Sequence, residues 1–215
     1  MEEIMYIPAW FREEDTSVLH DLMRQHSFAT LITTPEGRPF ASHLPFLLDA
    51  ERGPYGTLCA HMARANAQWR HFEDGQESLV IFQGPHTYIS PSWYADHLSV
   101  PTWNYAVVHA YGKPRLLGEA ETRALLASLV ETFEAPLEPP WRMDSLPEET
   151  IAKMLRGLVG FEIEIARLEG KLKLSQNRSE ADQEHVVEVL QASGDPNDAG
   201  VAAWMRRVRN AGPSD

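Results

Sequence analysis

Apolar residues in this chain gather in short β-rich runs or alternate with polar residues, which is typical of strands that bury one face. The runs at 28–34 and 39–49 flank a Pro-Glu-Gly-Arg-Pro turn in which Gly37 tolerates a positive φ, and this predicts a hairpin over 28–49. Residues 158–170 alternate, with Phe161, Ile163 and Ile165 on one face, as in a half-buried antiparallel strand. Further strands are predicted at 57–62, at 77–84 with an end at Gly84-Pro85, and within 104–112, where a long run should lie centrally in its sheet.

Other segments carry apolar residues at helical spacing. Val18, Leu19, Leu22 and Met23 predict a helix that begins near Asp15. A short helix is predicted over 63–75, with Asn66 as N-cap and Gly75 as its end. Residues 119–134 predict an amphipathic helix whose apolar face comprises Leu125, Leu126, Leu129, Val130 and Phe133. Three more helices are predicted, at 146–155, 180–194 and 198–210.

The order of these elements indicates the fold class. Hairpins dominate and a regular βαβ alternation is absent, which favours a small antiparallel Greek-key barrel of the α+β class, with peripheral helices, over a doubly wound parallel sheet. We expect a barrel domain over 1–178 and a helical extension over 179–215 that packs on it.

Charge and composition narrow the function classes. The 215 residues carry a formal net charge of -12, so direct sequence-independent binding to DNA is disfavoured, because such binding depends on neutralising phosphates. The one basic candidate is Trp204–Asn210, which holds three arginines. The single cysteine, Cys59, permits no intramolecular disulfide and is predicted to be a small core residue. No signal-peptide pattern and no apolar run of ~18 residues occur, so we expect a soluble, cytoplasmic protein with no membrane span.

Three segments combine aromatic and hydrogen-bonding side chains beside these strand-like runs: 56–69, 88–94 and 100–105. A core does not need so many polar groups, because each buried polar atom must find a partner. A pocket for a flat aromatic ligand with polar edges and a phosphate does need them, and indole faces suit stacking on such a ligand. A core role for Trp69, Trp93 and Trp103 stays open.

Each polar motif also has a purely structural interpretation. Arg64 and Asn66, at the start of the short helix, favour a phosphate site, or they are a solvated arginine and an N-cap. Residues 171–178 are a second phosphate or ring-edge site, or a basic turn after a strand. The nine histidines lack the close spacing of metal ligands, so backbone-bonded histidines are favoured and no metal site is predicted.

Four of these motifs together resemble the PaiB-type FMN-binding family of bacterial transcriptional regulators, which is itself similar to the pyridoxamine-phosphate-oxidase-like split barrels. The motifs are HMARANAQW, GPHTYISPSWY, VPTWNY and KLKLSQNR, and the resemblance covers about four-fifths of the chain, from MYIPAWF to KLKLSQNR. One position departs from the family, because Ala67 stands where the family usually has proline.

The resemblance implies an FMN-binding split β-barrel that forms a homodimer, with the flavin at the subunit interface. It assigns Arg64, Asn66 and His61 to the phosphate and ribityl end, with His43 as a weaker candidate. Thr102, Trp103 and Asn104 would line the ring. Lys173, Gln176 and Asn177 would close the site, from the second subunit in one arrangement. Catalytic residues are not assigned.

Three functions stay open. The resemblance favours a flavin-dependent transcriptional regulator in which FMN changes contacts with a partner. The alternatives are an FMN-dependent oxidoreductase that acts on a small molecule, since the flavin supplies the redox chemistry, and a haem-binding split barrel in which a histidine ligates iron.

Overall fold

The structure is a computed structural model that describes residues 5–95 and 99–211. Its strands are β1 (Arg12–Glu13), β2 (Phe28–Thr33), β3 (Phe40–Pro45), β4 (Leu47–Asp49), β5 (Thr57–Ala63), β6 (Ser78–Ile89), β7 (Thr102–Gly112), β8 (Pro114–Leu116), β9 (Leu158–Glu164) and β10 (Arg167–Lys173). Its α-helices are α1 (Thr16–Gln25), α2 (Glu119–Glu134), α3 (Glu148–Leu155), α4 (Glu180–Ala192) and α5 (Pro196–Ala211). Short 3-10 helices include η3 (Ala67–Asp74) and η4 (Pro91–Trp93).

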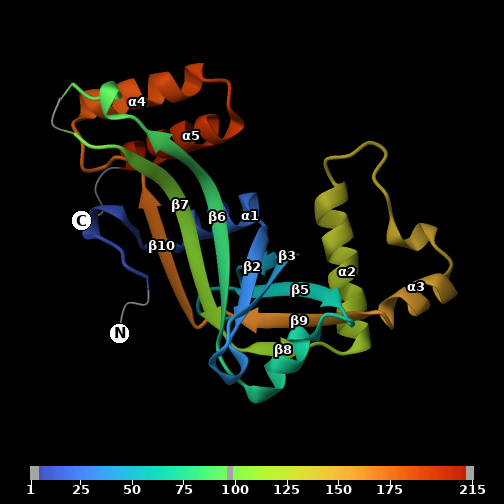
Figure 1. The fold of residues 1–215 in the computed structure, drawn as a ribbon. Coiled ribbons are helices and arrows are strands. Elements are labelled where there is room, and N and C mark those ends of the chain that lie inside the picture. The colour runs from blue at the N-terminus through green and yellow to red at the C-terminus, as the bar shows by residue number, and fades with distance from the viewer. Residues whose placement is uncertain (1–4, 96–98, 212–215) are drawn as a thin grey trace. The chain divides into compact units, whose positions relative to one another are not determined.

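Within the described residues, the strands form a sheet of six, in the order β1-β10-β7-β6-β2-β3, and a sheet of four, in the order β4-β5-β9-β8 (Figure 1). The registered pairs β1–β10, β2–β3, β2–β6, β4–β5, β5–β9 and β8–β9 are antiparallel. This is the antiparallel α+β architecture that the succession of hairpins predicted, and β7 lies centrally in its sheet as expected.

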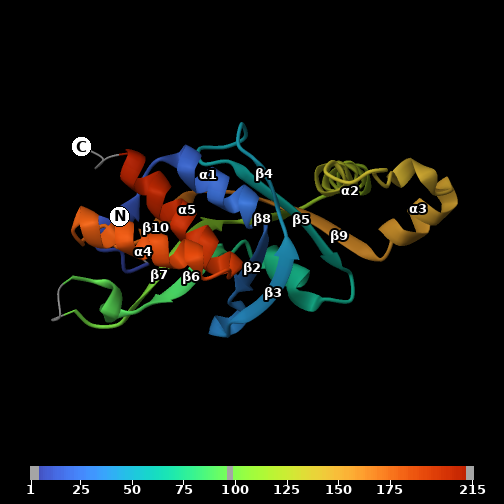
Figure 2. The ribbon, with the colours of Figure 1, turned by 90° about the horizontal axis from the view of Figure 1, so that it is seen from above.

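The chain divides into two compact units. The first, called unit 1 below, comprises residues 1–22, 83–108 and 169–215, and the second, unit 2, comprises residues 23–82 and 109–168. Both β6 and β7 contribute residues to each unit. The helices α4 and α5 belong to unit 1 and lie side by side (Figures 1 and 2).

Each unit has its own apolar core. In unit 2, the ring of Phe161 is fully buried, with its centroid 5.0 Å from that of Phe72 and 6.1 Å from that of Phe46. Ile163 and Ile165 are buried too, so the apolar face predicted for this alternating segment is confirmed. In unit 1, Val186, Leu190 and Met205 from α4 and α5 are buried.

The helices begin and end much as the sequence predicts. The side chain of Asn66 accepts a hydrogen bond from the main-chain nitrogen of Gln68 at 3.1 Å and caps η3. Gly75 ends that helix with φ 62°, a left-handed conformation that glycine adopts without the steric cost of a Cβ. Gly37 also has a positive φ, 74°, in the predicted turn.

Three strand predictions were wrong in extent. Strand β6 does not end at Gly84-Pro85 but continues to Ile89. The registered pairs between β2 and β6 stop short of Pro85. Since proline has no main-chain N–H, its place beyond this ladder means that no hydrogen bond to β2 is lost. The run 39–49 is two strands that separate at the buried Phe46 and join different sheets. The run 158–170 likewise turns after Glu164, so that β9 and β10 lie in different sheets.

Two smaller expectations also differ from the structure. Phe133 of α2 is exposed rather than part of the buried face of the helix. No strand was predicted before residue 28, but Arg12–Glu13 pair with Gly170–Lys171 as β1. No helix among the described residues is long and apolar enough to cross a bilayer.

Candidate functional site

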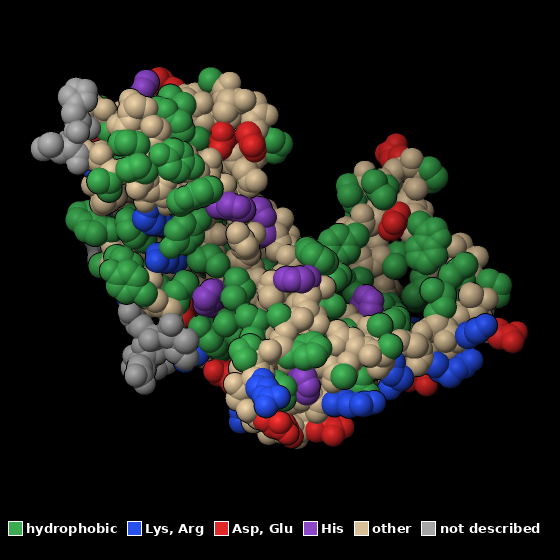
Figure 3. Space-filling model, in the orientation of Figure 1, with side chains coloured by type: hydrophobic (Ala, Val, Ile, Leu, Met, Phe, Trp, Pro, Cys, Tyr) green, Lys and Arg blue, Asp and Glu red, His purple; other side chains and the backbone are tan. Residues whose placement is uncertain are grey.

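A cavity of about 340 Å³ lies within unit 1 and contains three of the predicted site residues, Thr102, Trp103 and Lys173. The other residues that line it are Tyr6, Pro8, Phe11, Tyr105 and Lys171. This volume lies in the range of small-molecule sites, about 300–1,000 Å³. The space-filling view shows Lys or Arg side chains among hydrophobic ones on this part of the surface (Figure 3).

Two lysines from β10 supply the positive charge of this cavity. The Nζ of Lys173 donates hydrogen bonds to the hydroxyl of Thr102 and to the main-chain oxygen of Trp103, the latter at 2.7 Å. The Nζ of Lys171 donates to the main-chain oxygen of Tyr6 at 2.9 Å and lies 5.3 Å from the centroid of its ring. Burial, with further contributions from the charges of Lys171 and Arg178, holds the pKa of Lys173 below its usual value. Ammonium groups beside aromatic faces are suited to a planar ligand with anionic edges.

Trp103 presents its indole at the surface, with 54% of the residue exposed. Side chains from β6 support it: the ring centroid of Tyr88 lies 6.1 Å away at an angle of 77°, and that of His86 lies 6.5 Å away. An exposed indole with two rings beside it is a platform on which a heterocycle can stack.

Three other predicted residues of unit 1 make contacts within the protein or face solvent. Asn104 is fully buried, and its Nδ2 donates to the hydroxyl of Ser175 at 3.0 Å and to the sulfur of Met205 at 3.6 Å. Gln176 accepts from the main-chain nitrogen of Leu174 at 2.7 Å and donates to the main-chain oxygen of Leu172, so its amide closes the turn after β10. Asn177 is exposed.

The other four predicted residues, His43, His61, Arg64 and Asn66, belong to unit 2. Arg64 follows β5, and its guanidinium donates from Nε to the main-chain oxygen of Arg156 at 2.9 Å and from Nη2 to that of Leu158 at 2.8 Å. The indole nitrogen of Trp69 donates to the main-chain oxygen of Arg64 at 3.0 Å. Arg64 and Trp69 both line a second cavity, of about 430 Å³.

Asn66 has the structural role that the sequence offered as an alternative. Besides capping η3, it donates from Nδ2 to the hydroxyl of Ser42 on β3 at 2.8 Å. The next polar residue, Gln68, is fully buried and donates to the main-chain oxygens of Leu31 and Phe40 at 3.2 Å. These amides fix the loop of residues 63–66 against the β2–β3 hairpin.

His43 and His61 lie on β3 and β5 in different environments. The Nδ1 of His43 is 3.0 Å from the hydroxyl of Thr30, and the imidazole is exposed. The Nδ1 of His61 is buried and makes no hydrogen bond in the described part of the protein. Burial lowers the pKa of His61 below its usual value.

Two features of the structure were missed in the sequence. Tyr105 lines the unit 1 cavity with Trp103, and its spacing of two residues along a strand was a usable signal, since such side chains share a face. Tyr6 also lines this cavity, but it comes from a segment distant in sequence, and no local pattern could reveal it.

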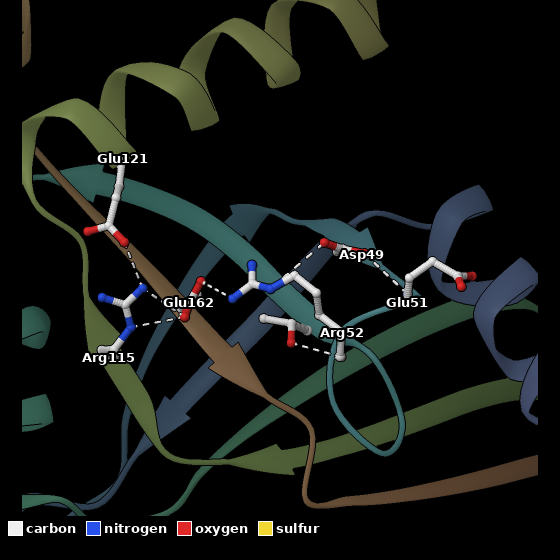
Figure 4. Close-up of polar contacts among 7 residues, drawn as sticks. Asp49, Glu51, Arg52, Arg115, Glu121 and Glu162 are labelled. Carbon is white, nitrogen blue, oxygen red and sulfur yellow. Dashed lines mark hydrogen bonds and ion pairs between the residues drawn. The ribbon is translucent and has the colours of Figure 1, made fainter.

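The second missed feature is an ion-pair cluster in unit 2 centred on Glu162, which lies between Arg52 and Arg115 (Figure 4). The nitrogen-to-oxygen distances are 2.8 Å to Arg52 and 2.9 Å to Arg115, and Arg115 also pairs with Glu121 at 2.8 Å. Burial opposes ionisation of Glu162, but the two guanidinium groups outweigh it and lower its pKa. Since both arginines are engaged with carboxylates, we interpret the cluster as structural.

The arginines of α5 are also engaged. Arg206 donates to the amide oxygen of Gln191 at 2.8 Å, Arg207 pairs with Asp21 at 2.7 Å, and Arg209 pairs with Glu184. Each guanidinium therefore has a partner within the protein, which reduces the positive field available to a DNA backbone.

Neither a reactive thiol nor a metal site is found in the described part of the chain. Burial, together with the nearby carboxylate of Glu162, raises the pKa of the Cys59 thiol, which therefore favours the less reactive protonated form. Within residues 5–95 and 99–211, no group of three or more His, Cys, Asp or Glu side chains could hold a metal ion.

Known proteins share this fold. The FAD and haem binding protein of Mycobacterium smegmatis superposes with a TM-score of 0.59 at 17% identity over 86% of this chain and 80% of that one. The flavocytochrome Anf3 of Azotobacter vinelandii superposes with a TM-score of 0.60 at 17% identity over 81% and 75%. The architecture is thus that of the split-barrel proteins with the pyridoxamine-phosphate-oxidase-like fold, as the sequence resemblance implied.

The sequence defines the family more closely. Residues 5–167 match the family described as "Putative FMN-binding domain". The chain is 39% identical over 201 residues to "Protease synthase and sporulation protein PAI 2" of Bacillus subtilis, covering 94% of this chain and 96% of the relative. It is 30% identical over 236 residues to "Uncharacterized protein AN0679" of Emericella nidulans, covering 91% and 93%. The chain belongs to the PaiB-type FMN-binding family and is a flavin-binding protein.

Proposed function

We propose that this protein binds FMN and acts as a flavin-dependent transcriptional regulator of the PaiB type. The observation that carries the proposal is the cavity of unit 1, in which an exposed indole and two lysines lie together. Trp103 would stack on the ring, and Lys173 would place a positive charge at its polar edge. A bound flavin supplies redox chemistry, and a cation near its ring tunes that chemistry.

We assign the phosphate end to the loop after β5. Arg64 binds main-chain oxygens through Nε and Nη2, and neither hydrogen bond uses Nη1, whose N–H groups can donate to a phosphate. Asn66 holds the same loop in place, and His61 and His43 lie on strands of the same unit. Two of the residues expected at the flavin bond within the protein instead: Asn104 is buried, and Gln176 is hydrogen-bonded to its own turn. We therefore assign Asn104 and Gln176 a supporting role and leave Asn177, which is exposed, at the edge of the site.

The ring group and the phosphate group belong to different units, and we propose that a homodimer forms the complete flavin site, with groups contributed by two copies of the chain. We also propose that residues 179–215 are an extension added to a flavin-binding domain over 1–178, since the family match ends at residue 167.

The regulatory part of the proposal rests on the name of the Bacillus subtilis relative, "Protease synthase and sporulation protein PAI 2". The net charge of -12 and the paired arginines of α5 support action through a protein partner rather than through direct contact with DNA. In this proposal, FMN occupancy or redox state changes the contacts with that partner.

A flavin-dependent oxidoreductase is the alternative, favoured by one observation. Lys173 lies in a cavity and has a lowered pKa, which is a feature of residues that exchange protons in active sites.

The decisive experiment identifies what the purified protein binds. We expect a yellow protein with a flavin spectrum, release of FMN on heat denaturation as identified by mass spectrometry, and a dimeric mass in solution. A haem spectrum, or no uptake of added FMN, would overturn the proposal. Rapid turnover of the flavin by NAD(P)H with a small-molecule acceptor would favour the oxidoreductase, and salt-dependent retardation of DNA by the pure protein would establish direct DNA binding.

A further inference from the structure

The second cavity, of about 430 Å³, lies wholly within unit 2 and has no residue in common with the cavity of unit 1. Most of its lining is apolar: Trp69, Leu116, Leu117, Leu155, Leu158 and Val159. These residues come from η3, from the end of α3, from β9, from the end of β8 and from the segment that joins β8 to α2. The interior therefore favours a ligand with a hydrocarbon or aromatic body.

Gly160 of β9 also lines this cavity. A Cβ at this position would lie 2.5 Å from the hydroxyl oxygen of Thr122 on α2, which is closer than real contacts allow. Gly160 thus lets α2 pack directly on the strand, and the main-chain oxygen of Gly160 accepts from the nitrogen of Leu117 at 2.9 Å. The walls are consequently held by a strand and a helix, as befits a preformed site.

Charged residues complete the lining. They are Arg64, Arg156 and Glu119, so positive charge exceeds negative by one. Arg64 is fixed by two hydrogen bonds to main-chain oxygens, from Nε at 2.9 Å and from Nη2 at 2.8 Å. Neither of these bonds uses the N–H groups of Nη1. Arg156 is exposed. Guanidinium groups beside an apolar interior match a ligand that joins an apolar body to a carboxylate.

We propose that the unit 2 cavity is a second ligand site, for a small aromatic carboxylate, which has Arg64 in common with the proposed flavin site. The apolar body occupies the space among Trp69, Leu117 and Leu155, and the carboxylate lies at the rim beside Arg64 and Arg156. A neutral analogue of the same shape keeps the apolar contacts and loses the charge-assisted hydrogen bonds.

The test is isothermal titration calorimetry of the purified flavin-free protein with 2-naphthoate, beside the neutral analogue 2-naphthylmethanol. We expect saturable binding of 2-naphthoate at one site per chain and affinity at least tenfold lower for the alcohol. Absence of binding, or equal affinity for the two compounds, would overturn the proposal.

Variants locate the binding. Arg156→Ala should lower the affinity for 2-naphthoate at least fivefold. The substitution keeps the main-chain oxygen of residue 156, which accepts a hydrogen bond from Arg64. Lys153→Ala is the matched control, because it removes an exposed charge from the neighbouring α3 helix without lining the cavity. Leu117→Trp should fill the cavity and abolish binding; circular dichroism and the thermal midpoint establish that the variant folds. Unchanged affinity in a folded Leu117→Trp protein would overturn the proposal.

A titration in the presence of FMN separates this inference from the proposed function. Arg64 lines the cavity and is also proposed to bind the flavin phosphate. We therefore expect 2-naphthoate to lower the affinity for FMN by a limited factor, which levels off at high concentrations of 2-naphthoate. Weakening that grows without limit would mean simple competition for one site and would overturn the second site. Failure of FMN to bind at all would refute the proposed function and leave the binding of 2-naphthoate as it is.

Discussion

The ammonium group of Lys173 donates a hydrogen bond of 2.7 Å to the main-chain oxygen of Trp103. This contact ties β10 to β7, two strands that are neighbours in the sheet although about 70 residues separate the two side chains in the chain. It fixes a positive charge beside the indole that we assign to the flavin ring. The following predictions test this assignment and the structure around it.

Trp103→Ala should weaken FMN about fivefold, because an offset-stacked aromatic contact contributes about 1 kcal/mol. The indole is 54% exposed, so the free energy of unfolding should change little. Quenching of flavin fluorescence on titration measures the affinity. Trp10→Ala is the control, since Trp10 is 69% exposed and does not line the cavity. An equal effect of both substitutions would remove Trp103 from the site.

Arg64→Ala should weaken FMN by about 1.5–3 kcal/mol, or roughly tenfold to a hundredfold, if its guanidinium donates to the phosphate. The same substitution removes two hydrogen bonds to main-chain oxygens, so the unfolding midpoint must be measured beside the affinity. Riboflavin, which lacks the phosphate, provides the control ligand. If Arg64→Ala weakens riboflavin as much as FMN, the residue does not bind the phosphate.

The stability of the protein should fall as pH decreases below about 6.5, in part because of His61. Burial lowers the pKa of folded His61 below its ordinary value of 6.5, so the unfolded chain binds the proton more readily. The resulting penalty is absent above pH 6.5, grows as pH falls through this window, and is complete below the folded pKa. His61→Gln should flatten the dependence of the urea midpoint on pH over this range. His185→Gln, which removes an exposed imidazole from α4, is the control for the loss of a histidine elsewhere in the chain.

Glu162→Gln should lower the free energy of unfolding by about 1–2 kcal/mol, because it removes the carboxylate between two guanidinium groups that are themselves partly exposed. High salt should shrink the difference, since screening weakens the ion pairs of the parent. Urea unfolding at two salt concentrations measures both effects. Glu164→Gln, an exposed change on the same strand, is the control. A Glu162→Gln protein as stable as the parent would show that the cluster contributes nothing net.

Particular residues show how far the sequence predicts this protein. Asn66 and Gly75 identified the short helix, because a cap acts on main-chain groups two or three residues away. The alternation around Phe161 identified a buried face, because the strand period is local. The same alternation gave no sign that the chain turns after Glu164 and enters another sheet, since strand pairing is decided by partners distant in sequence.

The candidate site divides in the same way. Several of its residues, including Trp103, Arg64 and Lys173, stand in sequence motifs. These motifs were enough to predict the family and the flavin cofactor. Only the tertiary structure decided that Tyr6 and Lys171 join Trp103 in one cavity, that Asn104 is buried against Ser175, and that Arg64 binds main-chain oxygens near residue 157. The physical reason is that caps and periodicities are short-range, whereas cavities arise from side chains that meet only when distant strands pair.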